Sequence, residues 1–238
     1  DGSMPLLAPM STIAGQLAFV VGSYHLLKHN KGKGVMIGHM DDMDPRVVTV
    51  IGAGVAGTQS ILKAIDNKAL VKVVDSSQSK LDDLKSKYGT ENVEYILSTK
   101  DSIQVSVNES DLVIGSVYVV GKEAPKVVTK DMLSSMNPGT VMVDVSIDQG
   151  GCFETSKPTT HDSPTFLEND IVHYCVTNMP GAVPLTATEA LNKVSLSYVE
   201  NLANNGIQNA LDSDEHLRNG LNILDGRIVH PGVKEALE

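Results

Sequence analysis

Four residues in the first third of the chain have the types and spacing of a nucleotide-binding site. Gly52, Gly54 and Gly57 follow a short β-branched run, and Asp75 comes eighteen positions after the third glycine. In a dinucleotide-binding turn the first glycine permits the tight turn, the second admits a pyrophosphate and the third lets helix and strand pack closely. A carboxylate roughly 20 residues further on accepts a ribose hydroxyl of NAD. The spacing therefore indicates a dinucleotide site that prefers NAD to NADP.

Two other interpretations of these residues stay open. A similar glycine-rich turn is used by S-adenosylmethionine-dependent methyltransferases, so the glycines alone do not identify the ligand. Asp75 can also be a solvated residue at the end of a strand. Binding of S-adenosylmethionine by the protein would reveal the methyltransferase alternative.

Alternating strands and helices position these residues. Apolar, β-branched runs predict strands at 47–51, 70–74, 93–97, 112–114, 141–145 and 171–176. Helical patterns follow the glycines through 65 and recur at 79–88, 103–107 and 130–136. Strands that alternate with helices predict an α/β fold, a doubly wound parallel sheet of Rossmann type.

Two long helices flank this predicted domain. The first is expected to be capped by Ser11 and to end near Asn30, with an inward face of Ile13, Leu17, Val20, Val21, Tyr24 and Leu27. The second follows Pro184, is opened by Thr186 and ends at Gly206. We therefore expect a nucleotide-binding domain over 1–182 and, over 183–238, a connecting helix with the C-terminal part of a second domain. The pair Asp225-Gly226 predicts a hairpin turn in that part.

Composition narrows the class of ligand and the compartment. The 238 residues carry a net charge of −10, and no basic stripe with interleaved aromatics is present, which argues against nucleic acid and favours a small molecule. No apolar run approaches the ~18 residues of a membrane span. The two cysteines form no CxxC pair, which suits a reducing compartment, so we expect a cytoplasmic location.

Two polar residues follow predicted strands at the edge where ligands of parallel sheets bind. Asp148 comes after the 141–145 strand and precedes two glycines, so it can act as a base, orient an ammonium group, bind a ribose or remain a solvated turn residue. Asn178 follows the 171–176 strand and can hydrogen-bond a nicotinamide or a substrate, with Met179 over a ring face. A hydrophobic turn between strand and helix is the alternative for this second segment.

The histidines and the missing motifs limit the chemistry. His161 has the best location for acid–base work, although a hydrogen-bonded structural histidine is the more common case. His173 lies inside an apolar strand, which indicates a core histidine. The sequence holds no HExxH, no paired cysteines and no clustered carboxylates, so we expect no metal. It also holds no GxSxG, which disfavours hydrolase chemistry.

Five phrases carry a resemblance to a known family. They are PLLAPMS at 5–11, VIGAGVAGT at 50–58, VDVSIDQGGC at 143–152, ETSKPTTH at 154–161 and VHYCVTNMPGAVP at 172–184. Together they resemble bacterial L-alanine dehydrogenase, in the family that alanine dehydrogenase shares with transhydrogenase. The resemblance implies a hexamer that interconverts L-alanine and pyruvate plus ammonia with NAD.

The resemblance also implies roles for single residues. Asp148 matches the family's active-site aspartate and Asn178 a residue beside the substrate. The positions around NAD are matched by Ser11, Gly52, Gly54, Val55, Gly57, Asp75, Lys80, Ser98, Val117, Ile147, Asp148 and Met179. The family's cations for the substrate carboxylate and its catalytic histidine precede the PLLAPMS phrase, in a part of the catalytic domain that this chain does not carry. Two alternatives stay open: an inactive NAD(H)-binding module, which the missing residues favour, and a transhydrogenase subunit of the same fold with a membrane partner.

Overall fold

The computed structural model describes residues 4–38, 40–119 and 123–237. The first three residues of the predicted nucleotide domain and the last residue of the second part lie outside this range. The chain divides into two compact units, of which the larger is Leu7–Ala187 and the smaller comprises Thr188–Glu238 with the residues before Leu7.

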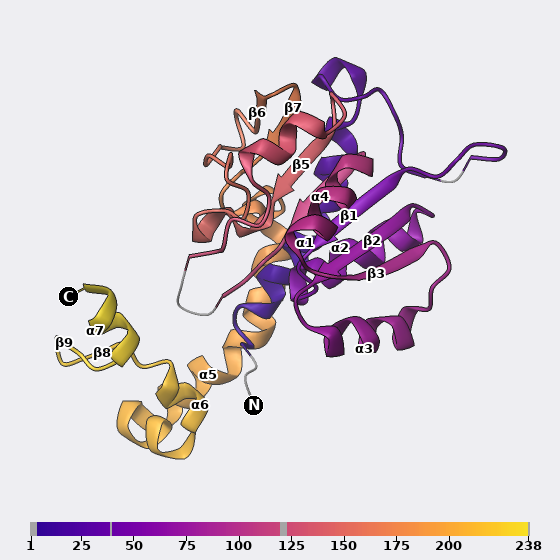
Figure 1. The fold of residues 1–238 in the computed structure, drawn as a ribbon. Helices are drawn as coiled ribbons and strands as arrows, with labels where there is room; N and C mark the ends of the chain where they lie inside the picture. Colours follow the sequence, from indigo (N-terminus) through magenta and orange to yellow (C-terminus); the bar gives the residue numbers. More distant parts are fainter. Residues whose placement is uncertain (1–3, 39, 120–122, 238) are drawn as a thin grey trace. The chain divides into compact units, whose positions relative to one another are not determined.

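The larger unit is a sheet with helices on both faces (Figure 1). Its strands are β1 Val47–Ile51, β2 Leu70–Asp75, β3 Val93–Leu97, β4 Leu112–Gly115, β5 Val141–Asp144, β6 Thr165–Glu168 and β7 Ile171–Tyr174. Its helices are α1 Ala8–His25, α2 Val55–Asp66, α3 Gln78–Tyr88 and α4 Lys100–Glu109, with 3-10 turns η1 Lys28–Asn30, η2 Lys130–Ser135, η3 Val145–Gln149 and η4 Met179–Ala182. The sheet order is β3-β2-β1-β4-β5-β7-β6, parallel except for β6. The doubly wound α/β prediction is confirmed.

Alternating side chains of the strands build two apolar layers. On β4, Leu112 and Ile114 join the layer covered by α1, α2 and α3, whereas Val113 faces the layer of α4 and η2. A strand buried on both faces must be apolar at every position, which explains its unbroken apolar sequence. The sequence did not predict β6, a short antiparallel edge strand.

The first long helix differs from its prediction in bounds and in face. It begins at Ala8 and ends at His25, so Ser11 lies inside it and does not cap it. Val20 and Tyr24, expected inside, are each 54% exposed. The buried face instead carries glycines: a Cβ added at Gly15 would lie 2.0 Å from the Ala56 carbonyl oxygen of α2. The face of α1 that packs therefore combines the close backbone approach at Gly15 with small side chains and Phe19, which is 5% exposed.

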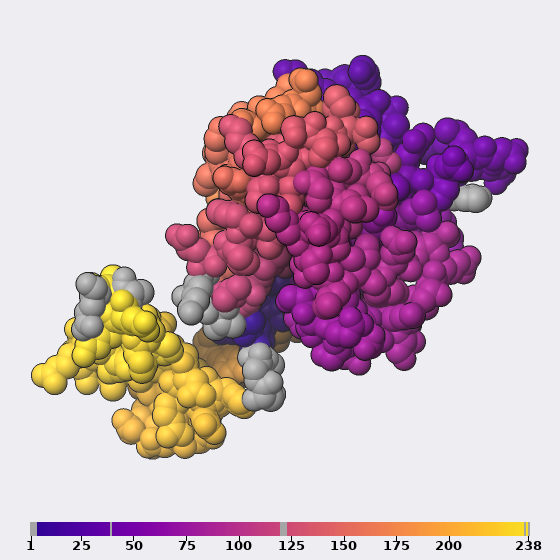
Figure 2. Space-filling view, in the orientation of Figure 1, coloured from indigo at the N-terminus to yellow at the C-terminus, as the bar shows by residue number. Residues whose placement is uncertain are grey.

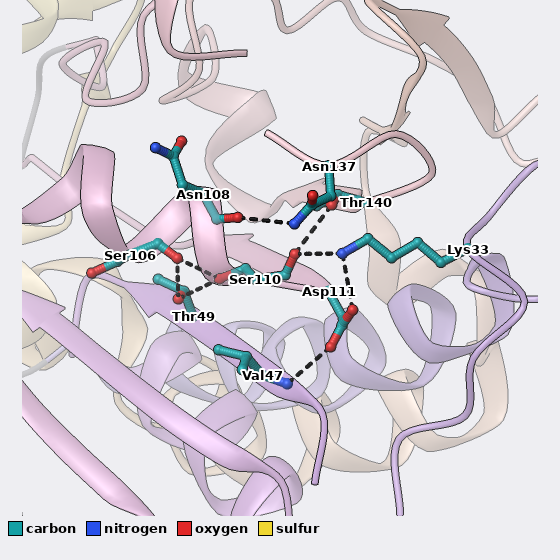
Figure 3. A network of polar contacts seen from close by, with 9 residues as sticks. All are labelled: Lys33, Val47, Thr49, Ser106, Asn108, Ser110, Asp111, Asn137 and Thr140. Carbon is teal, nitrogen blue, oxygen red and sulfur yellow. Dashed lines mark hydrogen bonds and ion pairs between the residues drawn. The ribbon is translucent and has the colours of Figure 1, made fainter. Parts of the chain in front are cut away.

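A network of polar contacts ties together the edge of the sheet where β1, β4 and β5 begin (Figure 3). Lys33 donates to the carbonyl of Ser110 and to Asp111 Oδ1, each at 2.9 Å, and Asp111 Oδ2 accepts the Val47 amide at 3.1 Å. Thr140 Oγ1 donates to the same Ser110 carbonyl at 3.1 Å. The Lys33 ammonium and the Asp111 carboxylate, both largely buried, thus tie the beginnings of β1 and β4 together, and the Ser110 carbonyl links them to Thr140 before β5.

Asp111→Ala is expected to lower the free energy of unfolding by about 2 kcal/mol, because it leaves the Lys33 ammonium and the Val47 amide without their acceptor. Glu94→Ala is the matched control, since its exposed carboxylate pairs with Lys72 at 3.6 Å and is expected to cost below about 0.5 kcal/mol. Urea unfolding of both variants measures the difference. Equal losses of unfolding free energy in the two variants would mean that the Asp111 contacts stabilise the fold no more than an exposed ion pair does.

The buried His25 gives the larger unit a pH-dependent stability. Its side chain is 7% exposed beside Tyr174, and its Nδ1 has no hydrogen-bond partner among the described residues. Burial lowers the pKa of His25 below its ordinary value of 6.5. Between the two pKa values, the folded state therefore binds fewer protons than the unfolded state. The free energy of unfolding is highest above the unfolded-state pKa and decreases as the pH falls from there toward the folded-state pKa.

His25→Phe is expected to reduce this acid sensitivity, because phenylalanine keeps a ring at the site and does not titrate. Between about pH 7.5 and about pH 5.5, the parent should lose up to about 1 kcal/mol more unfolding free energy than the variant. The exposed His216 provides the control variant His216→Ala. Identical pH profiles of parent and His25→Phe would contradict the assignment.

The smaller unit contains most of the second long helix and a hairpin. Helix α5 spans Pro184–Ser213 and begins two residues before Thr186, so Thr186 does not open it. Gly206, with φ 74°, breaks the helix where its end was predicted. Then follow α6 Glu215–Asn219, β8 Ile223–Leu224, β9 Arg227–Ile228 and α7 Pro231–Leu237. Asp225 and Gly226 both have positive φ, which confirms the predicted turn.

The segment before β1 extends from the body of the larger unit (Figure 2). It exposes Met36, Met40 and Met43.

None of the described helices combines the length and the apolar character that crossing a membrane requires.

Candidate functional site

The turn between β1 and α2 has the geometry that its glycines predict. A Cβ at Gly57 would lie 1.8 Å from the Gly52 carbonyl oxygen, and Gly52 itself has φ 97°. Beside Gly54, by contrast, an added Cβ would meet no atom within 4 Å. The fold therefore requires the first and third glycines for its own packing. The second leaves open space at the N-terminus of α2, where the first-turn amides and the helix dipole favour an anion.

Asp75 fastens this turn to the end of β2. Its Oδ2 accepts the Ala53 amide at 2.7 Å and its Oδ1 accepts the Ser77 amide at 2.8 Å, and the residue is 7% exposed. The interpretation of Asp75 as a freely solvated strand end is therefore wrong. Each carboxylate oxygen keeps a second lone pair, so the group can brace the glycine turn and still accept a ribose hydroxyl.

A row of contacts links the carboxyl ends of β1, β4 and β5. Ser116 Oγ donates to the Gly52 carbonyl at 2.8 Å, and Ser146 Oγ donates to the Val117 carbonyl at 2.8 Å. The sheet order places β4 between β1 and β5. The glycine turn, Val117 and the segment with Asp148 therefore lie along one edge, beside the point where the strand order reverses.

The two residues expected to be catalytic are in contact. The backbone amide of Asn178 donates to Asp148 Oδ1 at 3.2 Å, across thirty positions of sequence. Both side chains are exposed, whereas their neighbours Ile147 and Met179 are buried. The Asp148 carboxylate and the Asn178 backbone amide thus lie in contact beyond the carboxyl ends of β5 and β7.

The remaining predicted cofactor residues lie at the same edge of the sheet or on the helices beside it. Val55, 49% exposed, opens α2, and Lys80 is an exposed residue of the first turn of α3. Ser98 follows β3, and its amide donates to the Asp75 carbonyl at 2.9 Å. Ser11 lies half-buried one turn before Gly15, the residue through which α1 contacts α2.

The histidines differ in their surroundings. His173 is fully buried, its Nδ1 lies 3.1 Å from the Ile171 carbonyl and its Nε2 lies 2.8 Å from Thr155 Oγ1. Burial lowers the pKa of His173, so the expectation of a satisfied core histidine is confirmed. His161 is exposed, with its Nε2 3.3 Å from the Asn178 carbonyl oxygen.

Sequence reasoning missed the buried carboxylate of Asp144, which hydrogen-bonds the segment on both sides of Asp148. It accepts the amides of Ser146 at 3.0 Å and Cys152 at 2.9 Å and the hydroxyl of Ser156. Burial raises its pKa, although these hydrogen bonds oppose the shift. An aspartate that ends an otherwise apolar strand was the available signal. The carboxylate holds the loop that follows Asp148 against β5.

Both cysteines are free and buried. Burial raises the pKa of the Cys175 thiol to about 12 and that of Cys152 well above its usual range. Both thiols stay protonated and are therefore unsuited to nucleophilic chemistry. Within the described ranges, no group of three or more histidine, cysteine, aspartate or glutamate residues could hold a metal ion.

The features of this edge of the sheet indicate the kind of ligand that it binds. An open turn of three glycines before a helix, a carboxylate at the end of the next strand and a reversal of strand order beside them are the features of a dinucleotide-binding domain. The space beside Gly54 and the free lone pairs of Asp75 fit the pyrophosphate and ribose of NAD.

The chain belongs to the family described as "Alanine dehydrogenase/PNT, C-terminal domain", whose model matches residues 18–231. It is 48% identical over 99% of its length to the alanine dehydrogenase of Halomonas elongata, of which it covers 63%. A solved L-alanine dehydrogenase aligns with TM-score 0.94 and 43% identity, over 99% of this chain and 64% of that one. A transhydrogenase structure from Sinorhizobium meliloti aligns over 94% of this chain and 63% of its own, with TM-score 0.79 and 21% identity, a likeness of fold. The chain thus spans just under two thirds of the length of these relatives.

Proposed function

We propose that this chain forms the nucleotide-binding part of an NAD-dependent L-alanine dehydrogenase, which interconverts L-alanine and pyruvate plus ammonia. The observation that carries the proposal is the contact between Asp148 and Asn178 at the edge that also carries the glycine turn. The 48% identity to an alanine dehydrogenase over nearly the whole chain supports it.

The residues of this edge have separate tasks in the proposal. Gly54 and the first turn of α2 bind the pyrophosphate, and Asp75 accepts the ribose hydroxyls. When NAD is bound, its nicotinamide ring accepts a hydride. Asp148 takes up the proton released as water adds to the oxidised substrate carbon, and gives it back in the reverse direction. The side-chain amide of Asn178 orients the substrate beside this carboxylate.

Two neighbouring proposals concern assembly and location. By family membership we propose a homo-oligomer, a hexamer, and a cytoplasmic location. The two buried free thiols suit a reducing compartment. The transhydrogenase alternative has weaker support, because identity falls to 21% for that structure against 43% for the L-alanine dehydrogenase structure.

A combined assay tests the proposal on the 238-residue chain. NADH binding is measured by fluorescence, and NADH formation from L-alanine and NAD is followed in the same sample. Turnover would show that the chain completes its own active site. Binding without turnover would agree with a nucleotide part whose substrate-carboxylate cations lie elsewhere in the protein, and an absence of binding would contradict the proposal.

A further inference from the structure

The backbone of Asn178 is held on both of its polar atoms in an unusual conformation. Its φ of 51° and ψ of 54° lie in the left-handed region, which few residues other than glycine and asparagine adopt. Its amide donates to Asp148 Oδ1 at 3.2 Å, and its carbonyl oxygen accepts the Gly181 amide at 2.9 Å. The same carbonyl oxygen lies 3.3 Å from His161 Nε2.

The segment that carries His161 is fixed beside the chain that leaves β7. Thr159 pairs with Val176 in a parallel bridge, and its amide donates to the Cys175 carbonyl at 2.9 Å. Thr159 Oγ1 also donates to the Pro164 carbonyl at 3.0 Å, which closes the turn around the histidine. His161 therefore reaches Asn178 from an anchored segment.

Gly181 leaves room for this arrangement. A Cβ added there would lie 3.1 Å from Asn178 Nδ2 and 3.5 Å from His161 Nε2. The first distance is tighter than ordinary packing and the second is an ordinary van der Waals contact, so the asparagine amide and the imidazole both lie beside Gly181.

The contact with the Asn178 carbonyl oxygen determines which ring nitrogen of His161 carries hydrogen. A carbonyl oxygen can only accept a hydrogen bond, so Nε2 must bear hydrogen and donate to it. The nitrogen that faces Asn178 therefore offers no lone pair to a substrate proton, and only Nδ1 of the neutral imidazole keeps one.

We infer that His161 is a positioning residue that acts through Asn178. It donates to the Asn178 carbonyl while Asp148 accepts the Asn178 amide, and the two contacts fix the turn that presents the exposed Asn178 to the nicotinamide end of the site. The inference rests on the proposed function, in which Asp148 and Asn178 act on a substrate that passes its hydride to the nicotinamide.

Ligand binding by three variants tests this role. His161→Ala removes the donor, His161→Gln supplies an amide donor in its place, and His216→Ala removes an exposed histidine from the other unit. Affinities for NADH and for ADP-ribose, which lacks the nicotinamide, are measured on the whole chain. We expect His161→Ala to weaken NADH binding about fivefold, as for one lost hydrogen bond, and to leave ADP-ribose binding unchanged. His161→Gln should restore most of the loss, and His216→Ala should match the parent.

Loss of affinity for both ligands, or for neither, in His161→Ala would overturn the inference. Hydrogen exchange of the Asn178 and Gly181 amides in the same samples separates this failure from failure of the proposed function. If the parent binds no NADH, the proposed function fails. Exchange about tenfold faster in His161→Ala would then still support the contact, and unchanged exchange would refute it.

Discussion

Asp148→Asn is expected to lower turnover of L-alanine by about 10²- to 10³-fold in any form of the protein that catalyses the reaction, with NADH affinity changed less than about threefold. The carboxamide has nearly the same shape and can still accept the Asn178 amide through its oxygen. It cannot take up a proton. The variant therefore separates proton transfer from positioning of the 178–181 turn.

Steady-state kinetics and NADH titration of the same preparation measure the two effects. The matched control is Asp162→Asn, which makes the same change at an exposed aspartate next to His161. It is expected to keep the turnover of the parent. If Asp148→Asn turned over as fast as the parent, Asp148 would be a structural residue of its turn.

Asp75→Ala is expected to weaken NADH binding by about 2 to 3 kcal/mol, or roughly 30- to 150-fold. Two effects add. The ribose hydroxyls lose an ionised acceptor, and the Ala53 and Ser77 amides lose the group that holds the glycine turn at the end of β2. The preference for NADH over NADPH should also narrow, because the negative charge that repels a 2′-phosphate is gone.

Asp75→Asn separates the two effects. The amide oxygen of the asparagine can keep one of the two backbone contacts, although the charge is removed. NADH affinity should therefore fall less than in Asp75→Ala. The preference for NADH over NADPH should narrow in both variants. Fluorescence titration with NADH and NADPH gives both quantities. Equal affinities in the parent and in Asp75→Ala would contradict the assignment.

The sequence predicted the strands better than the helix faces. β1 and β2 begin where β-branched runs predicted them, because central strands buried on both faces need such runs. For α1, hydrophobic periodicity selected Val20 and Tyr24, whereas the structure buries Gly15 and Gly22. A search for apolar side chains at helical spacing does not find a helix face that packs through glycines.

The candidate site shows the same division. Asp75, Asp148 and Asn178 could be located from sequence, because each follows a strand of a parallel sheet and so must lie at one edge. Their partners could not be predicted. The contact between Asp148 Oδ1 and the Asn178 amide joins residues thirty positions apart, and Asn178 makes it from a left-handed conformation. The 103–107 helix was likewise predicted too short, because its capping box uses Ser102 in place of the usual glutamate.

Direct titration of the 238-residue chain with NADH, with S-adenosylmethionine as the comparison ligand, shows whether the glycine turn binds a nicotinamide dinucleotide. We expect saturable NADH binding that NAD displaces and that Asp75→Ala weakens, with S-adenosylmethionine unable to compete. Binding of S-adenosylmethionine, or NADH binding that is indifferent to Asp75, would contradict the assignment of the glycine turn and its carboxylate to NAD.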